Sequence, residues 1–339
     1  MTMSMEERLI FLIGTPRSGS TLLARMLGSH SAIHNRPEAH LLTPLAHLGY
    51  YGTVQKAPYD PFNVTEAIHD VVADLPRKEA DYLDACRAYT DVIYSRLLTG
   101  SGKDLFLDKT PAYALVLHFI TKLYPKARYV VQTRHPVAIF SSYASSFFDG
   151  DYKVAQNHNP ILNRYVPAIA RLLRDRPVPL VHVRYEDVVR APAAALEAIC
   201  TFLGLPFEPG MVEYGKHEHV EKGLGDPLGV KQHDRPVTTS VEKWTEEFAA
   251  DGAKIEFVRD IIASLDPDEL QVWGYDHDEI LAALEGARGR PRRPRERLKL
   301  ERYRLERKLL VALRRNIHHN KLGRVLKRAR FALDVVLRE

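Results

Sequence analysis

Residues 14–21, GTPRSGST, place glycines, hydroxyl side chains and one arginine directly after a short apolar run at residues 9–13. A helical pattern of apolar residues begins at Leu22, so the stretch predicts a strand, a tight turn and the start of a helix. Such a turn aims backbone N–H groups and the positive end of the helix dipole at one point, which favours a phosphate. We therefore predict a phosphate-binding loop, although the pattern also fits a turn that only joins a strand to a helix.

The loop departs from the usual nucleoside triphosphate pattern at one informative position. Against G-x-x-x-x-G-K-[ST], Gly14, Gly19 and Thr21 match, but Ser20 stands where the lysine is expected. That lysine normally reaches the β- and γ-phosphates. The sequence thus predicts a loop that binds a phosphate without hydrolysing ATP.

Further charged and polar side chains stand where other apolar runs end. Lys109 follows residues 105–107, Arg134 follows residues 128–133, and Tyr185 follows a run that ends at Val183. Ligands of parallel sheets bind at the carboxyl ends of the strands, so we expect these side chains to lie near Arg17. Cations and N–H dipoles would stabilise an anionic leaving group, and a carboxylate such as Glu38 would remove a proton from an acceptor. No aspartate-rich metal site is visible in the sequence.

The elements that must position these residues alternate regularly. A short apolar run followed by a helical pattern occurs four times, at residues 9–13, 105–107, 128–133 and 178–183. This alternation is typical of a parallel sheet covered by helices on both faces. We therefore predict an α/β, P-loop-type three-layer fold with a central parallel sheet and a basic helical C-terminal extension.

Less regular segments lie between and after these units. Residues 34–42 predict a short second strand or a loop, and the turn-rich residues 44–63 predict an irregular segment on the substrate side. Residues 208–236 predict a long loop, which in a compact domain is usually functional or disordered. Helices are expected at about 65–74, 79–98, 113–123, 137–146, 193–203 and 240–265, and the globular body is expected to close at residues 273–275.

Taken together, the strand-end motifs resemble those of the sulfotransferases that use 3′-phosphoadenosine 5′-phosphosulfate (PAPS). TPRSGST resembles their 5′-phosphosulfate loop, and RHPVAIFSS, with Ser142 eight residues after Arg134, resembles their 3′-phosphate motif. The two motifs in this order, each at a strand-to-helix junction, are much more specific than either alone. The resemblance covers about residues 8–275 and is closest to the bacterial and tyrosylprotein-type branch. It implies transfer of a sulfonyl group from PAPS to a hydroxyl, with adenosine 3′,5′-bisphosphate (PAP) as the product.

The resemblance also implies residue roles at the donor. Arg17 would bind the 5′-phosphosulfate, while Arg134 and Ser142 would hold the 3′-phosphate. Tyr185 matches a tyrosine near the adenosine, and Arg235 resembles a basic residue of the segment that closes over the nucleotide, a role that Lys231 could take instead. The remaining donor-binding positions of the loop would be Pro16, Ser18, Gly19, Ser20 and Thr21.

The same resemblance assigns the residues that act on the transferred group. Lys109, in DKTP, would neutralise charge on the sulfonate and the bridging oxygen, with Arg17 assisting. Glu38 stands 21 residues after Arg17, where the tyrosylprotein-type enzymes have their base. The more familiar cytosolic sulfotransferases use a histidine base, so histidines stay open as alternatives here: His233 first, then His217, His219 and His135. A zinc site at His217-x-His219 lacks further ligands at a useful spacing.

Composition separates an acidic body from a basic tail. The 339 residues carry a net charge of +5, but residues 286–339 hold 19 Lys/Arg against 5 Asp/Glu, which leaves about −9 for residues 1–285. We expect a sulfotransferase domain at residues 1–285 and a basic helical tail at residues 286–339 that binds an acidic partner or another copy of the chain. No apolar stretch is long enough to span a bilayer, the N-terminus does not resemble a secretory signal, and two distant cysteines fit a reducing cytoplasm.

Two rival functions remain at this stage. A P-loop small-molecule kinase would share the loop, but Ser20 and the lack of a metal-binding aspartate argue against it. A non-enzymatic scaffold with an anion-binding tail would explain the basic residues, although the tail has few aromatics for stacking on nucleic acid bases. The acceptor stays open between small-molecule and carrier-bound hydroxyls.

Overall fold

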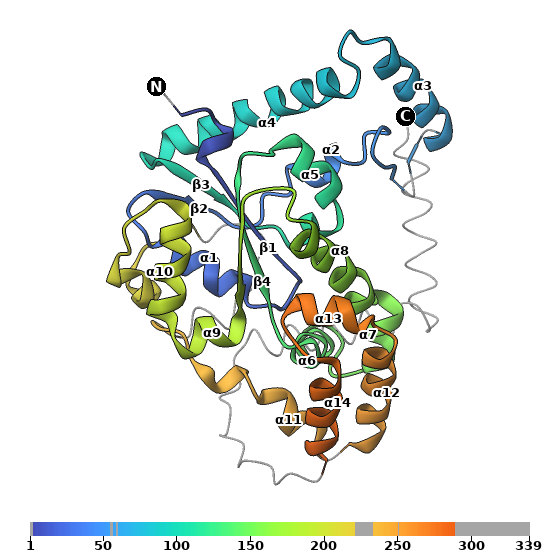
Figure 1. Cartoon of the computed structure of the whole chain (residues 1–339), viewed down its shortest axis with the longest axis vertical. Coiled ribbons are helices and arrows are strands. Elements are labelled where there is room, and N and C mark those ends of the chain that lie inside the picture. The colour runs from blue at the N-terminus through green and yellow to red at the C-terminus, as the bar shows by residue number, and fades with distance from the viewer. Residues whose placement is uncertain (1–2, 55–56, 59, 221–232, 250, 289–339) are drawn as a thin grey trace, which may run out of the picture.

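A parallel five-stranded sheet forms the centre of the computed structural model, which describes residues 3–54, 57–58, 60–220, 233–249 and 251–288 (Figure 1). The strand order is β2-β3-β1-β4-β5, and every neighbouring pair is parallel. The strands are β1 (Leu9–Gly14), β2 (Ile33–Asn35), β3 (Leu105–Asp108), β4 (Arg128–Thr133) and β5 (Leu180–Arg184). The predicted α/β fold is confirmed, and the stretch predicted as a strand or a loop supplies the edge strand β2.

Burial on both faces explains why the sequence of β1 is a continuous apolar run. Leu9, Phe11 and Ile13 belong to one hydrophobic core, whereas Ile10 and Leu12 belong to the other, and all five are fully buried. Successive side chains of a strand point to opposite faces, so each face of β1 needs an apolar partner layer. The sheet is therefore the middle layer of three.

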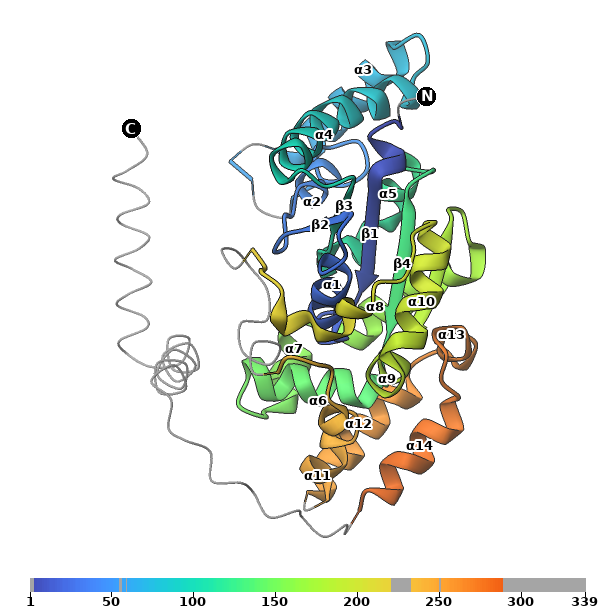
Figure 2. The ribbon, with the colours of Figure 1, turned by 90° about the vertical axis from the view of Figure 1, so that its left-hand side faces the viewer.

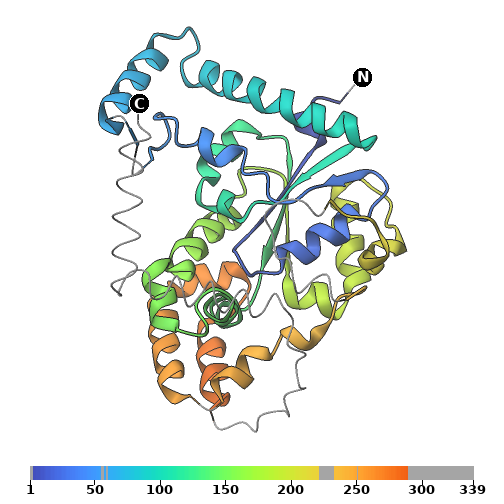
Figure 3. The same ribbon diagram turned by 180° about the vertical axis from the view of Figure 1, so that it is seen from behind.

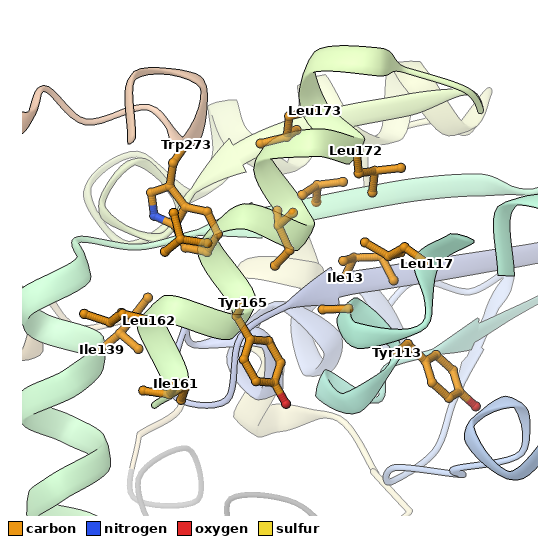
Figure 4. Packing of buried hydrophobic residues seen from close by; sticks show 14 of the residues in the cluster. Ile13, Tyr113, Leu117, Ile139, Ile161, Leu162, Tyr165, Leu172, Leu173 and Trp273 are labelled. Atoms are coloured by element: carbon orange, nitrogen blue, oxygen red, sulfur yellow. The ribbon is translucent and has the colours of Figure 1, made fainter. Parts of the chain in front are cut away.

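Helices cover the two faces in unequal numbers (Figures 1 and 2). One core includes residues of α1 (Ser20–Gly28), α9 (Tyr185–Arg190), α10 (Pro192–Leu203) and the 3-10 segment η3 (Pro209–Lys216). The larger core on the other face includes residues of α4 (Glu79–Ser101), α5 (Leu117–Leu123), α6 (Pro136–Phe147), α8 (Ile161–Asp175), α12 (Gly252–Ala263), α13 (Pro267–Trp273) and α14 (His277–Gly286). Figure 4 shows this larger core around α8, where Leu162 lies near Ile139.

The remaining short elements connect these layers. They are η1 (Glu6–Arg8), α2 (Leu42–Leu45), α3 (Pro61–Asp74), η2 (Pro111–Leu115), α7 (Tyr152–His158), η5 (Thr238–Ser240) and α11 (Lys243–Phe248). In Figure 3, α3 and α4 form an arm across the top of the molecule. Among the helices that the structure describes, none has the length and apolar content to cross a membrane.

Several predicted segments differ in detail. The segment predicted as irregular at residues 44–63 includes part of α2 and the start of α3. The predicted loop at residues 208–236 contains η3, and the body continues past residue 275 into α14. Helices α7 and α8 were not predicted; α8 has an apolar stripe that packs in the larger core. Residues 289–339 lie outside the described residues, so the predicted basic helices of the tail stay a prediction.

Candidate active site

The loop between β1 and α1 has the local geometry of an anion-binding turn. Arg17 and Gly19 both adopt left-handed backbone conformations, with φ of 69° and 88°. The Ser18 hydroxyl donates to the Thr15 carbonyl over 2.9 Å, which ties the turn to its own start. A Cβ on Gly19 would lie 2.3 Å from the Tyr185 ring, so only glycine fits where the ring rests on the loop. The loop thus gathers backbone N–H groups at the N-terminus of α1.

The loop meets the other predicted donor motif. The Arg17 guanidinium donates through Nε to the Ser142 hydroxyl of α6 over 3.1 Å, although 125 positions separate the two residues. Arg134, which follows β4, donates from Nη1 to the Arg17 carbonyl over 3.0 Å. Its Nη2 donates to the Ser240 carbonyl over 2.7 Å. The structure therefore brings Arg17, Arg134 and Ser142 together, with a fourth segment around Ser240 joining them.

Arg134 is a buried cation without a direct ion pair among the described residues. The residue is only 7% exposed, and the Glu186 carboxylate acts on its charge from beyond ion-pair distance. Its Nε has no hydrogen-bond acceptor among those residues, and burial lowers the pKa of the guanidinium. The guanidinium stacks on the Tyr185 ring at 4.3 Å, and the Tyr185 and Ser240 hydroxyls lie 2.5 Å apart. Because burying an uncompensated charge is costly, the site has the character of one completed by an anionic ligand.

The residue after Arg134 belongs to the scaffold rather than to the open edge of the site. The His135 ring stacks on Trp244, with centroids 5.0 Å apart, and its backbone N–H donates to Glu186. Burial and the neighbouring Arg134 charge lower the pKa of His135 to about 4, so the ring is neutral near pH 7. Trp273 donates its indole N–H to the Arg134 carbonyl over 3.0 Å. These contacts fix the backbone that presents Arg134.

Lys109 lies between the phosphate loop and the predicted base. Its Nζ donates to the Thr21 hydroxyl over 3.3 Å and to Glu38 Oε1 over 2.7 Å. The lysine side chain is 4% exposed and that of Glu38 is 17% exposed, so the pair is largely shielded from water. The ammonium can therefore act on a group held by the loop while it keeps contact with the carboxylate.

A buried carboxylate at the end of β3 holds this region together. Asp108 accepts hydrogen bonds from the hydroxyls of Tyr94, at 2.7 Å, Tyr113, at 3.0 Å, and Thr110, at 3.2 Å. Burial raises the pKa of Asp108, and the three hydroxyl donors oppose that rise. The Tyr113 oxygen accepts from the Leu42 N–H over 3.2 Å. The segment after Glu38 is thus tied to the strand that positions Lys109.

His40, which no sequence motif singled out, lies beside the predicted base. Its Nε2 lies 3.5 Å from Glu38 Oε2, the carboxylate oxygen that Lys109 does not contact. Its φ of 52° is a left-handed value that a histidine rarely adopts, and its N–H donates to the Thr110 hydroxyl over 3.4 Å. The only signal in the sequence is its place two residues after Glu38.

Other predicted candidates lie elsewhere in this structure. Arg235 is 65% exposed and forms an ion pair with Glu213. His217 accepts or donates through Nε2 at the Gly210 carbonyl, and His219 does so at the Tyr214 carbonyl, so neither ring lies against Glu38 or Lys109. His233 is exposed, and Lys231 lies outside the described residues. Within the described ranges, no group of three or more His, Cys, Asp or Glu could hold a metal ion.

The comparisons with known proteins agree on one family. A family model described as "Sulfotransferase family" matches residues 9–209. A solved structure, the sulfotransferase domain from the olefin synthase of Synechococcus PCC 7002, is 26% identical, covers 79% of this chain and 94% of its own, and superposes with a TM-score of 0.53. The matched residues include both donor motifs and the Lys109 region.

Curated relatives are longer than the matched region. The nodulation protein NoeE of Sinorhizobium fredii is 27% identical over 291 residues, which are 78% of this chain and 65% of that protein. An Aquifex aeolicus protein is 24% identical over 252 residues, which are 70% of this chain and 30% of that protein. The chain therefore spans less than two thirds of the length of these two relatives.

Proposed function

The chain belongs to the sulfotransferase family, and from that premise we propose that it transfers a sulfonyl group from PAPS to a hydroxyl of a small-molecule or carrier-bound acceptor. The proposal depends on a nucleotide with anionic groups at both its 3′ and 5′ positions. The observation that carries it is the meeting of Arg17, Ser142 and Arg134 at one end of the sheet.

The donor would lie across the tips of β1 and β4. The loop N–H groups and the Thr21 hydroxyl would hold the 5′-phosphosulfate, since they surround the N-terminus of α1. Arg134 and Ser142 would hold the 3′-phosphate, which would supply the anion that the buried guanidinium lacks. Tyr185, pressed on Gly19 and on Arg134, would line the adenosine side of the same surface.

Lys109 would serve the leaving group. Its ammonium reaches the Thr21 hydroxyl of the loop, so a small displacement toward the loop would place it on the bridging oxygen between phosphorus and sulfur. Negative charge grows on that oxygen as the sulfur–oxygen bond breaks, and a shielded cation stabilises it strongly. Arg17 would add a second positive charge from the opposite side of the loop.

Glu38 would remove the proton of the acceptor hydroxyl. It lies next to Lys109, so an acceptor hydroxyl that contacts Glu38 would be held beside the transferred group, and in-line transfer would require its oxygen to reach sulfur opposite the leaving oxygen. Release of the Lys109 contact toward the donor would free Oε1 to accept a hydrogen bond from the acceptor. Positioning and charge stabilisation would then supply most of the rate, as in phosphoryl transfer.

Ligand-induced stabilisation tests the donor assignment directly. We expect PAP to raise the thermal midpoint of the full chain well above the shift caused by ATP with Mg²⁺ or by adenosine 5′-phosphate. A larger shift with ATP and Mg²⁺ would favour a P-loop kinase instead. A second measurement, PAP release from PAPS over a panel of phenols and alcohols, would then identify the acceptor class. No stabilisation by any nucleotide would favour a scaffold.

We also propose a division of the chain into two parts with separate roles. We propose that residues 1–285 carry the transfer activity and that the basic residues 286–339 bind an acidic partner or another copy of the chain. Removal of residues 289–339 should leave PAP binding unchanged, because the site described above uses none of them. Salt-sensitive association that disappears with the tail would support the binding role, and unchanged association would contradict it.

A further inference from the structure

We propose that His40 is the proton acceptor for Glu38: the imidazole takes over the proton that Glu38 removes from the acceptor hydroxyl and passes it to water. The inference rests on the sulfotransferase activity proposed above and adds a residue to it. His40 acts through Glu38 and is therefore a positioning and relay residue. Neither the family motifs nor the sequence spacing singles it out.

The geometry of the Glu38 carboxylate carries the proposal. Each of its oxygens has a different nitrogen partner, Lys109 Nζ at 2.7 Å from Oε1 and His40 Nε2 at 3.5 Å from Oε2. The two sides also differ in their access to water, because the His40 side chain is 38% exposed and that of Lys109 is 4% exposed. The imidazole therefore offers a path from Glu38 Oε2 to solvent that the buried lysine on Oε1 does not offer.

The backbone at His40 is held in an uncommon conformation by the same hydrogen-bond network that positions Lys109. A left-handed φ at a histidine costs of the order of 1 kcal/mol or more and persists only where surrounding contacts impose it. Here the His40 N–H donates to the Thr110 hydroxyl, which in turn donates to Asp108. Two residues further along the chain, the Leu42 N–H donates a hydrogen bond to the Tyr113 oxygen. These contacts hold the backbone from which the ring reaches Glu38.

The proton balance of the step is complete with water as the final acceptor. The acceptor oxygen forms a bond to sulfur as its O–H bond breaks, and the bridging oxygen of PAPS leaves with the electron pair of the S–O bond. The released proton moves to Glu38, then to His40 Nε2, and the imidazolium loses its Nδ1 proton to solvent. The charged groups near His40 are Glu38, from its own segment, and Asp108, from the end of β3, while Lys109 contacts the other oxygen of Glu38.

Two substitutions separate a relay from a purely structural role. His40→Asn keeps a side chain that tolerates the left-handed conformation but cannot carry the proton. His40→Gly also fits this φ and leaves space for free imidazole. The matched control is His158→Asn, because His158 is exposed at the C-terminal end of α7 and has no proposed role in the reaction. Turnover is followed as PAP release from PAPS with the best phenol or alcohol of a panel, in the full chain.

We expect kcat to fall about 10²-fold in His40→Asn and His40→Gly, the lower end of general acid–base contributions, with KM for PAPS within about twofold. Added imidazole should restore at least about tenfold in His40→Gly and nothing in His40→Asn, and the step in kcat between pH 5 and 8 should be absent from both variants. Unchanged kcat would overturn the proposal. A loss of kcat that imidazole does not restore would make His40 structural and overturn it as well. If the unaltered chain bound no PAP and sulfonated no acceptor, the proposed function itself would be wrong, and the role of His40 that depends on it would be wrong too.

Discussion

Lys109 and Glu38, 71 positions apart in the sequence, meet with Nζ 2.7 Å from Oε1 in a largely buried ion pair. The contact joins the end of a central strand to the segment that follows the edge strand β2. It holds the two groups proposed for the leaving group and for the base in one hydrogen bond. The hydrogen bond thereby orients the two side chains relative to one another.

Removal of Lys109 should separate transfer from donor binding. In Lys109→Met, kcat for sulfonyl transfer should fall about 10²- to 10³-fold, because the charge on the bridging oxygen loses its shielded cation. The Kd for PAP should change by less than about threefold, since PAP lacks the sulfonate. Isothermal titration and PAP-release assays measure the two quantities. Lys122→Met is the control, because Lys122 is half-exposed and pairs with Glu79 on the surface. Near-normal turnover of Lys109→Met would remove this residue from the mechanism.

Removal of the proposed contact between Ser142 and the 3′-phosphate should reduce the preference of the protein for PAP over adenosine 5′-phosphate. Ser142→Ala should weaken PAP binding about tenfold and leave adenosine 5′-phosphate binding unchanged, because one hydrogen bond to a charged group contributes about 1.5 kcal/mol. Ser146→Ala, one turn further along α6, supplies the matched control. Equal weakening of both nucleotides would contradict the assignment of Ser142 to the 3′ end.

Glu247 should stabilise the segment that contacts Arg134. One of its carboxylate oxygens accepts from the hydroxyls of Ser141, at 2.5 Å, Ser145, at 3.0 Å, and Tyr152, at 3.4 Å, which fastens α11 to α6 and α7. Glu247→Ala should lower the free energy of unfolding in urea by about 2 kcal/mol, because three part-buried hydroxyls lose a charged acceptor. Glu242→Ala, at an exposed position just before α11, should change it by less than about 0.5 kcal/mol. An effect no larger than that of Glu242→Ala would show that α11 is held by other contacts.

Two buried histidines should make the protein acid-sensitive. Burial lowers the pKa of both His135 and His182 to about 4, from an ordinary value of 6.5. The unfolded chain then binds more protons than the folded one between about pH 6.5 and pH 4, so stability is full above pH 6.5 and falls as the pH drops through that window. The loss is at most about 3 kcal/mol for each histidine. Urea unfolding from pH 7 to pH 4 measures it.

The histidine contribution can be isolated by substitution. In His182→Gln, the new amide can keep a hydrogen bond to Thr133, which His182 Nε2 contacts at 2.8 Å. The slope of the unfolding free energy against pH reports the number of protons taken up on unfolding. This number should decrease by up to one in the window below pH 6.5. His69→Gln, at an exposed position on α3, should leave the slope as it is. An unchanged slope in His182→Gln would mean that this ring does not titrate with unfolding.

Gly19→Ala should damage the donor site more than its small size suggests. The added methyl would meet the Tyr185 ring at 2.3 Å, and the φ of 88° disfavours any side chain. We expect loss of PAP-induced stabilisation in a thermal shift assay and a lower thermal midpoint. Gly100→Ala in α4, where a Cβ meets nothing within 4 Å, is the control and should raise the midpoint slightly. Normal PAP binding by Gly19→Ala would show that the loop adapts.

The parts of this structure that the sequence predicted share a local signal. Strands β1, β3 and β4 are apolar runs buried on both faces, and each ends at a motif whose residue types have a direct chemical meaning. The meeting of Arg17 with Arg134 followed from topology, because parallel strands end at one edge. The short strand β2 lies at the edge of the sheet and has only three residues, so its pattern was ambiguous.

The unpredicted parts depend on contacts between distant residues. Ser240 reaches Arg134 across 106 positions, and Trp273 reaches the Arg134 carbonyl across 139. Neither has a spacing that a sequence pattern could reveal. The network of Asp108, Thr110 and His40 needed the three-dimensional structure for the same reason, since a backbone N–H on a side-chain hydroxyl leaves no trace in residue types. Arg235 was predicted from resemblance alone; its side chain forms a surface ion pair with Glu213, and its role at the nucleotide stays a prediction.

The placement of Glu38 after the edge strand has a consequence for how such enzymes diversify. The proposed donor contacts come from β1 and β4, inside the sheet, whereas the proposed base follows β2, which has a neighbour on one side only. Substitutions and insertions in the segment from residue 36 into α3 can therefore change the acceptor specificity while the proposed donor-binding residues stay the same. Exchange of this segment between related proteins should transfer the acceptor preference and leave the affinity for the donor unchanged.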